Sequence, residues 1–194
     1  EANGAGGSAQ TGDAGNGTGG TAYITVTSGT QGSGTFSGNT AILANGIGGT
    51  PDEGGIGGTG RGGVAYAQAQ AASVVRFGSL QVTASGRGGE SEGDQVAYVG
   101  GAGFGGSAEL RSLGSGSSLI VERNFDFNIF ADSLNGGAIV AALGIGGITT
   151  GGTGIGGAGN GGAIVLRAAQ GGSMALPANP NNDPGSGGFN RLLA

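Results

Sequence analysis

Residues 19–23 read Gly-Gly-Thr-Ala-Tyr, and closely similar sequences return at residues 62–66, 105–109 and 161–165. The first two steps are 43 residues long and the third is 56 residues long, which indicates an insertion of about 13 residues in the third unit. A fixed period of this size is typical of stacked repeats, in which each unit buries its apolar face against the next.

A second pattern follows each of the first three copies. It reads Ile-Leu-Ala-Asn-Gly at residues 42–46, Val-Thr-Ala-Ser-Gly at 82–86 and Ile-Phe-Ala-Asp-Ser at 129–133, and a pair of glycines comes soon after each. Each unit therefore reads as a glycine-rich lead, a strand, a turn, a second strand and a glycine-rich exit.

Alternating polarity predicts the strands. Residues 119–132 place mostly apolar side chains at odd positions and mostly polar ones at even positions, which indicates one half-buried strand or two joined at a bend. Residues 22–27 and 80–84 also alternate. Residues 64–72 are rich in Ala and Gln and suit a helix, but their place in the repeat predicts a strand.

Glycine supplies 52 of the 194 residues, and only four are proline, which excludes a collagen helix. Glycine tracts in register with strands predict extended chains whose backbones pack closely. Residues 58–63 fit a dinucleotide-binding glycine pattern, but they lack the preceding strand and following acid that such a site needs. We predict an all-β, repetitive β-solenoid resembling a parallel β-helix, with polyglycine-II-like or extended connections and little or no helix.

The expected organisation is one stacked domain between two shorter segments. The glycine-rich lead is expected at residues 1–14, the stacked domain at 15–176, and a Pro- and Asn-rich linker with a C-terminal segment at 177–194. The units of the stack are expected at residues 15–57, 58–101, 102–152 and 153–176.

The absence of Lys, His and Cys removes most catalytic chemistry. Zinc, haem and iron–sulfur sites need Cys or His, and catalytic triads, Schiff bases and phosphate-binding P-loops need His or Lys. We therefore expect a protein that is not an enzyme and needs no cofactor. The chain begins at Glu1 without a methionine, so we also expect it to be a piece of a longer, processed protein.

Charge and hydropathy limit the classes of partner that the chain can bind. Seven scattered arginines against twelve acids give a net charge of −5, which argues against nucleic acid binding. The longest mostly apolar run, residues 138–148, is broken by glycines and falls well short of the ~20 residues of a membrane span.

The densest acidic cluster is Glu90, Glu92 and Asp94. In an extended chain these carboxylates share one face and offer oxygen ligands to calcium; the alternative is a solvated turn.

Tyr23 and Tyr66 occupy equivalent repeat positions and form either a sugar-binding aromatic ladder or a simple stack between units. Asp52 and Glu53 follow Pro51 in a predicted surface turn, one of three loop regions that are candidates for receptor contact. These regions are residues 51–55, 90–95 and 177–185.

Glu122, Asp126 and Asp132 lie on the polar face predicted for residues 119–132. A pair of carboxylates is the machinery of glycoside hydrolysis, whereas a charged outer face also keeps a strand soluble and blocks edge pairing.

The recurring Gly-Gly-x-Ala-Tyr and Ile/Val-x-Ala-x-Gly patterns resemble the glycine-rich repeat regions of bacterial filamentous-haemagglutinin-like surface adhesins, over residues 15–175. This resemblance implies a secreted, elongated, right-handed β-helix that works in attachment or as a fibre. The glycine tracts also resemble phage tail-tip adhesins built on polyglycine-II bundles, in which loops between the tracts contact a receptor.

Together these patterns predict an extracellular or cell-surface structural protein that self-associates into a filament through stacked strands. The alternative is an adhesin segment, of bacterial or phage tail-tip type, that binds a surface glycan or receptor. The third interpretation is a β-helix carbohydrate-active enzyme. The expected partner is another copy of the chain in the first case and a glycan or receptor in the second.

Overall fold

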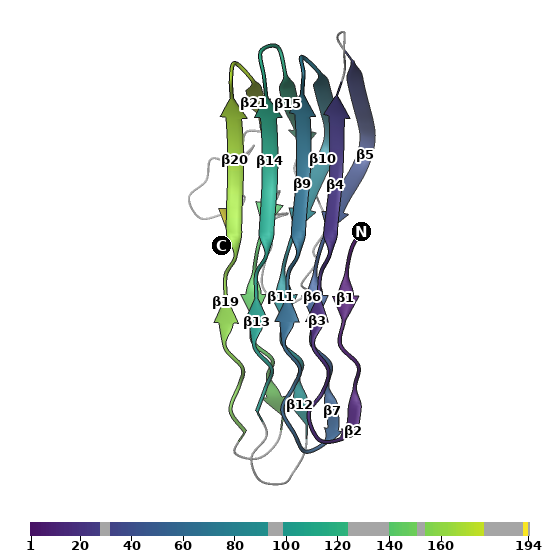
Figure 1. The fold of residues 1–194 in the computed structure, drawn as a ribbon, viewed down its shortest axis with the longest axis vertical. Coiled ribbons are helices and arrows are strands. Elements are labelled where there is room, and N and C mark those ends of the chain that lie inside the picture. Colours follow the sequence, from purple (N-terminus) through teal and green to yellow (C-terminus); the bar gives the residue numbers. More distant parts are fainter. Residues whose placement is uncertain (28–31, 93–98, 124–139, 151–153, 177–191, 194) are drawn as a thin grey trace.

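A computed structural model describes residues 1–27, 32–92, 99–123, 140–150, 154–176 and 192–193. Within these ranges the chain forms strands and no helix, and every strand pairing is parallel. The predicted all-β class is therefore confirmed. The chain runs repeatedly up one layer and down the other, so that strands far apart in sequence lie side by side in two facing layers (Figure 1).

The upper front sheet holds the four copies of the glycine–alanine pattern. Its strands, in the order β20-β14-β9-β4, are β4 (Thr21–Thr27), β9 (Val64–Gln70), β14 (Ser107–Leu113) and β20 (Ala163–Ala169). The register aligns Thr21 with Val64, Val64 with Ser107, and Ser107 with Ala163. The pairing that the repeat spacing predicts is confirmed, and so is the strand within residues 64–72.

The upper back sheet carries the chain downward again. Its strands are β5 (Ser33–Leu43), β10 (Val74–Thr83), β15 (Ser118–Arg123), β16 (Val140–Ala141), β21 (Ser173–Ala175) and β22 (Leu192–Leu193). Strand β10 pairs with β5 on one side and with β15 and then β16 on the other. Ile42 aligns with Val82, as the second sequence pattern predicts.

The prediction that residues 129–133 form the third copy of the second pattern is wrong. Val82 pairs with Val140, not with Ile129, and residues 129–133 lie outside the described residues. Ser79 and Val82 are three positions apart in β10. Their register partners, Arg123 and Val140, are seventeen positions apart. The insertion that lengthens the third repeat therefore lies between β15 and β16.

Glycine-rich strands form the lower half. The lower front sheet contains β3 (Gly17–Thr18), β8 (Gly60–Arg61), β13 (Gly103–Phe104) and β19 (Gly159–Asn160). The lower back sheet contains β1 (Gly4–Ala5), β6 (Gly46–Ile47), β11 (Gly86–Arg87) and β17 (Gly144–Ile145). Below them lie two strand pairs, β2 (Ala9–Thr11) with β7 (Pro51–Glu53) and β12 (Ser91–Glu92) with β18 (Thr149–Thr150).

Pro51 corrects a second expectation. Residues 51–53 were predicted to be a surface turn, but they form β7, with Pro51 aligned to Ala9. Proline cannot donate to a ladder, and it is tolerated here because it is the first residue of a short strand.

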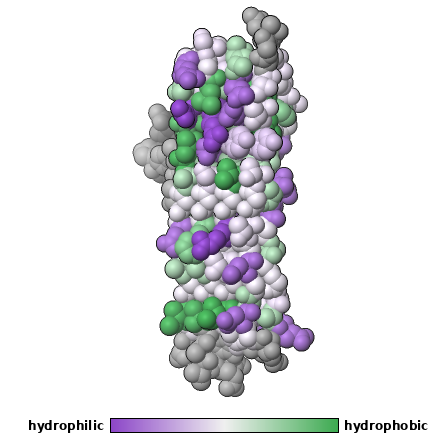
Figure 2. Space-filling model, viewed as in Figure 1, coloured by the Kyte–Doolittle hydropathy of each residue, from purple (hydrophilic) through white to green (hydrophobic). Residues whose placement is uncertain are grey.

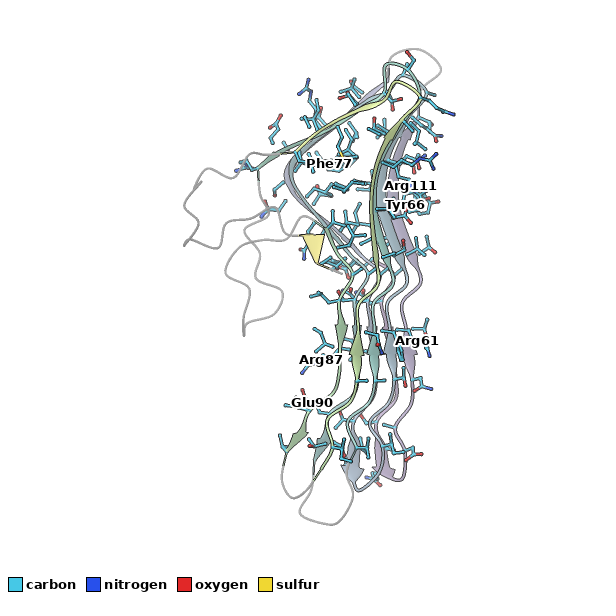
Figure 3. The ribbon with its side chains drawn as sticks, turned by 90° about the vertical axis from the view of Figure 1, so that its left-hand side faces the viewer. Arg61, Tyr66, Phe77, Arg87, Glu90 and Arg111 are labelled. Atoms are coloured by element: carbon cyan, nitrogen blue, oxygen red, sulfur yellow. The ribbon has the colours of Figure 1, made fainter. Side chains whose placement is uncertain are left out.

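An apolar core fills the space between the two upper sheets. The front sheet contributes small side chains such as Ala65 and Ala67, and the back sheet contributes larger ones such as Phe77 and Leu80, all fully buried. Phe77 stacks on Phe36 of the neighbouring strand with ring centroids 5.0 Å apart. Figure 3 shows Phe77 among the side chains that lie between the separated upper layers.

The lower layers approach so closely that no side chain fits between them. A Cβ atom added to Gly101 would lie 2.0 Å from the carbonyl oxygen of Gly58. Amides instead donate across the gap, for example from Gly58 to Gly49 at 2.9 Å and from Gly89 to Gly58 at 2.8 Å. The complete series of donors and acceptors runs from Gly157 through Gly147, Gly101, Gly89, Gly58, Gly49 and Gly15 to Gly7. The close backbone packing predicted from the glycine tracts is confirmed.

Candidate functional site

The outer face of the upper front sheet carries Tyr23, the most exposed aromatic side chain among the described residues. Because Ala65 and Ala67 point into the core, the side chain between them, Tyr66, points outward. Tyr23 is its register partner, and the two rings stack with centroids 5.1 Å apart and planes 6° apart. Tyr23 keeps 59% of its surface exposed because β4 is the last strand of this sheet.

Arg111 covers Tyr66 from the other side. Its Cζ atom lies 4.7 Å from the Tyr66 ring centroid, and Arg111 and Tyr23 lie on strands that flank β9 on opposite sides. The Arg111 Nε donates to Glu109 at 2.6 Å, and the Ser107 hydroxyl donates to the other Glu109 oxygen at 2.7 Å. The Arg111 charge is therefore neutralised, and its guanidinium is held over the ring (Figure 3).

The equivalent arginine on the last strand has no such partner. Arg167 aligns with Arg111, but Val165 stands in its strand where β14 has Glu109. Arg167 is exposed, and no carboxylate in the described part of the chain pairs with it.

The two ends of the stack expose apolar side chains that belong to the core. Leu110 in β14 is fully buried, whereas its register partner Leu166 in the terminal strand β20 is 40% exposed. At the opposite end, Ile24 and Val26 of β4 point toward the core and are only partly buried. Within the described part of the chain, no strand pairs with the outer edge of β4 or of β20, and the apolar side chains of both edges stay partly exposed.

The lower half carries further side chains on its outer faces. On the front layer, the Arg61 Cζ atom lies 4.3 Å from the Phe104 ring centroid. An apolar row near the lower end joins Ile56, Val99 and Ile155 through parallel bridges, and Figure 2 shows it as a hydrophobic band.

Of the three predicted calcium ligands, only Glu90 has a described side chain. Glu90 forms an exposed ion pair with Arg87, Glu92 belongs to β12, and Asp94 lies outside the described residues. Over the ranges described, no three acidic, histidine or cysteine side chains form a cluster that could hold a metal ion. The calcium site stays a prediction from the sequence.

The remaining candidates lie in β7, in β15 or outside the described residues. Asp52 is exposed in β7, next to Glu53 in the same strand, at the lower end of the molecule. Glu122 is exposed at the end of β15, while Asp126 and Asp132 lie outside the described residues.

Comparisons with protein-family models, with curated proteins and with solved structures found no match. In the parts of the chain that the structure describes, no helix is long and apolar enough to cross a membrane.

Sequence reasoning identified the Tyr23–Tyr66 pair but missed the two arginines. Arg111 and Arg167 are separated by the same 56 residues as the third and fourth copies of the glycine–alanine pattern. Extending the repeat comparison a few residues beyond the tyrosine position would have placed them in one row.

Proposed function

We propose that this chain is an extracellular structural protein that self-associates into a filament by continuing its own strand stacking from copy to copy. The molecule would be a β-solenoid, each coil of which runs up the front layer and down the back layer. The observation that supports this proposal is the pair of open ends, at which the described residues leave parallel strand edges and core-facing apolar side chains uncovered.

The edge strands lack the features by which soluble proteins usually prevent such pairing. Natural sheets protect their edges with charged residues, prolines or covering segments. Strand β4 reads Thr-Ala-Tyr-Ile-Thr-Val-Thr and β5 reads Ser-Gly-Thr-Phe-Ser-Gly-Asn-Thr-Ala-Ile-Leu, without a charge or a proline. Strand β20 has a single charge, Arg167, on its outer face.

The glycine-rich half suits the same role. Its layers are joined by backbone hydrogen bonds and pack like polyglycine-II chains, an arrangement that needs neither a large core nor cysteine. Each further coil that is added would find the same donors and acceptors at the open end, so the cross-layer ladder can propagate without new side-chain chemistry.

A second candidate is an adhesin segment that binds a surface glycan. The exposed Tyr23 ring, stacked on the half-buried Tyr66 and with the Thr25 hydroxyl on the same face, supplies the aromatic and polar groups that sugar binding uses. In this case, Tyr23→Ala would abolish retention on immobilised glycans and leave the chain monomeric.

Two matched isoleucine substitutions test self-association. Ile24→Lys places a charge among the core-facing side chains of the terminal strand β4, where it would oppose pairing with another copy. Ile47→Lys adds the same charge to the outer face of β6, an inner strand, at a side chain that is 49% exposed. Both variants should fold, as checked by circular dichroism.

Sedimentation velocity and electron microscopy over a range of concentrations would separate the outcomes. We expect filaments for the wild type and for Ile47→Lys, and monomers for Ile24→Lys. A wild-type chain that stays monomeric at every concentration, or an Ile24→Lys variant that polymerises normally, would contradict the proposal.

A further inference from the structure

We propose that Arg167 of one copy covers the free face of Tyr23 of the next copy, and that this contact fixes the register of head-to-tail stacking. The inference rests on the proposed self-association and names the surfaces that meet. These are the outer edges of β20 and β4, the two terminal strands of the upper front sheet.

Tyr23 has one ring face left for such a contact. One face is stacked on Tyr66, which belongs to β9, the strand that pairs with β4 among the described residues. The other face points to the unpaired edge, and the side chain is 59% exposed. Within the molecule the corresponding position on the far side of Tyr66 is filled by the guanidinium of Arg111.

Arg167 occupies the position that mirrors this arrangement across the boundary between two copies. Arg111 reaches Tyr66 diagonally, because its own register partner is Gln68 and Tyr66 stands two residues earlier on that strand. If β20 were placed against β4 of another copy in the register of the sheet, Arg167 would align with Thr25, two residues after Tyr23. This is the sequence offset of Arg111 to Tyr66, with the guanidinium approaching the ring from the opposite side. Arg167 has no carboxylate partner within the described ranges, so it is free to adopt this position.

The core-facing side chains of β20 and β4 also match in this register. Leu166 would meet Ile24, and Ala168 would meet Val26, so that apolar side chains now left partly exposed would cover one another. Neither edge places a carboxylate in these rows, so no charge repulsion opposes the pairing.

The terminal strands of the other three sheets also align when a second copy is stacked head to tail on the first. The lower front sheet ends in β19 and β3, with Gly159 and Gly17 in the same row, and the lower back sheet ends in β17 and β1, with Gly144 and Gly4 in one row. In the upper back sheet, Ser173 of β21 shares a row with Ser33 of β5. One translation along the stack therefore pairs all four sets of terminal strands.

Engineered cysteines test the register directly, because the chain has no cysteine of its own. Thr21→Cys and Ala163→Cys would be made as separate proteins and mixed under mild oxidation. These two exposed positions lie in the same row, so their Cα atoms would be about 5 Å apart across the interface. The matched control is Thr27→Cys with Ala163→Cys, because Thr27 lies about 20 Å farther along β4.

The arginine contact is tested by the concentration at which filaments form. We expect Arg167→Gln to raise this critical concentration about two- to fivefold, the range expected for one exposed cation–π contact. In a Tyr23→Leu background, which has already lost the aromatic ring, Arg167→Gln should have no further effect. Arg76→Gln removes an exposed charge from the back sheet, away from both edges, and should change nothing.

The outcomes distinguish this inference from the function on which it rests. Crosslinked dimers from the 21/163 mixture, and none from the 27/163 mixture, would support the inference. Wild-type filaments without the 21/163 crosslink would overturn the register, and equal critical concentrations for Arg167→Gln and wild type would overturn the arginine contact. Either result would leave self-association intact. A wild-type chain that never assembles would overturn both.

Discussion

The upper and lower halves join the same two layers of parallel strands by opposite means. In the upper half the layers are held apart by buried side chains such as Phe77 and Leu110, so stability comes from apolar surface removed from water. Between the glycine strands of the lower half there is no room for a side chain, and backbone amides such as those of Gly58 and Gly101 donate directly to the facing layer.

The difference shows that glycine acts here as a structural residue of defined position. Glycine costs more conformational entropy on folding than any other residue, so a tract of it is stable only if its backbone groups are satisfied. The lower half meets that condition because each extended chain bonds both within its sheet and across the gap. The two halves should therefore respond differently to the addition and removal of a methyl group.

The largest effect is expected from adding one methyl group to the lower half. Gly101→Ala would place its Cβ atom 2.0 Å from a backbone oxygen of Gly58, which cannot rotate away as a side chain can. We expect a loss of about 4 kcal/mol or more in unfolding free energy, measured by chemical denaturation. Gly7→Ala is the control, since its Cβ atom would meet nothing within 4 Å; equal losses in both variants would contradict the close packing.

Removing a side chain should break the upper half, but only inside the stack. Leu110→Ala would create a cavity in the core and should cost about 3 kcal/mol in unfolding free energy. Leu166→Ala makes the same change at the register partner in the terminal strand, where we expect about 1 kcal/mol or less in the monomer. The same denaturation experiment compares them, and a larger loss for Leu166→Ala would show that the terminal strand is not an open end.

A smaller effect is expected at the junction between the halves. The Asn45 side-chain oxygen accepts a hydrogen bond from the Ser85 amide at 2.9 Å, and Asn3 accepts one from the Asn45 amide in the same way. Asn45→Ala should cost about 1 kcal/mol, because the Ser85 amide loses its side-chain acceptor. Asn160→Ala changes an exposed side chain and should alter the unfolding free energy by no more than about 0.5 kcal/mol. Equal losses for the two variants would show that the hydrogen bonds of Asn3 and Asn45 do not stabilise the fold.

The smallest effect concerns the surface ion pair of Arg87 with Glu90. Glu90→Gln removes the pair in a solvated position, so the unfolding free energy should change by about 0.5 kcal/mol or less, and salt should reduce the difference further. Thermal unfolding at low and high ionic strength measures this. A change that exceeds 2 kcal/mol would indicate that the acidic segment contributes more than a solvated pair can.

The sequence predicted the upper half better than the lower half. The spacing from Tyr23 to Tyr66 placed the strands in register, because alternation marks which side chains face the core. A glycine tract shows no alternation of polar and apolar side chains. The sequence therefore indicated close packing without showing that Gly58 faces Gly49. The third copy of the second pattern was misassigned because the insertion after Arg123 contains a similar sequence. Residues 129–133 resemble residues 82–86, but Val82 pairs with Val140.

The candidate site was predicted only in part. Equivalent positions identified the tyrosine stack, whereas the guanidinium over Tyr66 depends on a diagonal contact between strands that no local pattern shows. Pro51 was assigned to a turn because proline and acidic residues favour turns, but the pairing of β7 with β2 overrode that preference.

The central claim, that the stack continues from copy to copy, is tested most directly by the axial repeat of assembled material. Four layers spaced by about 4.8 Å give a subunit repeat of about 19 Å along the stack. Cryo-electron microscopy of the concentrated wild-type chain, with no ligand added, should show filaments with both spacings. Dispersed single particles at every concentration, or filaments whose strands do not run across the filament axis at this spacing, would contradict it.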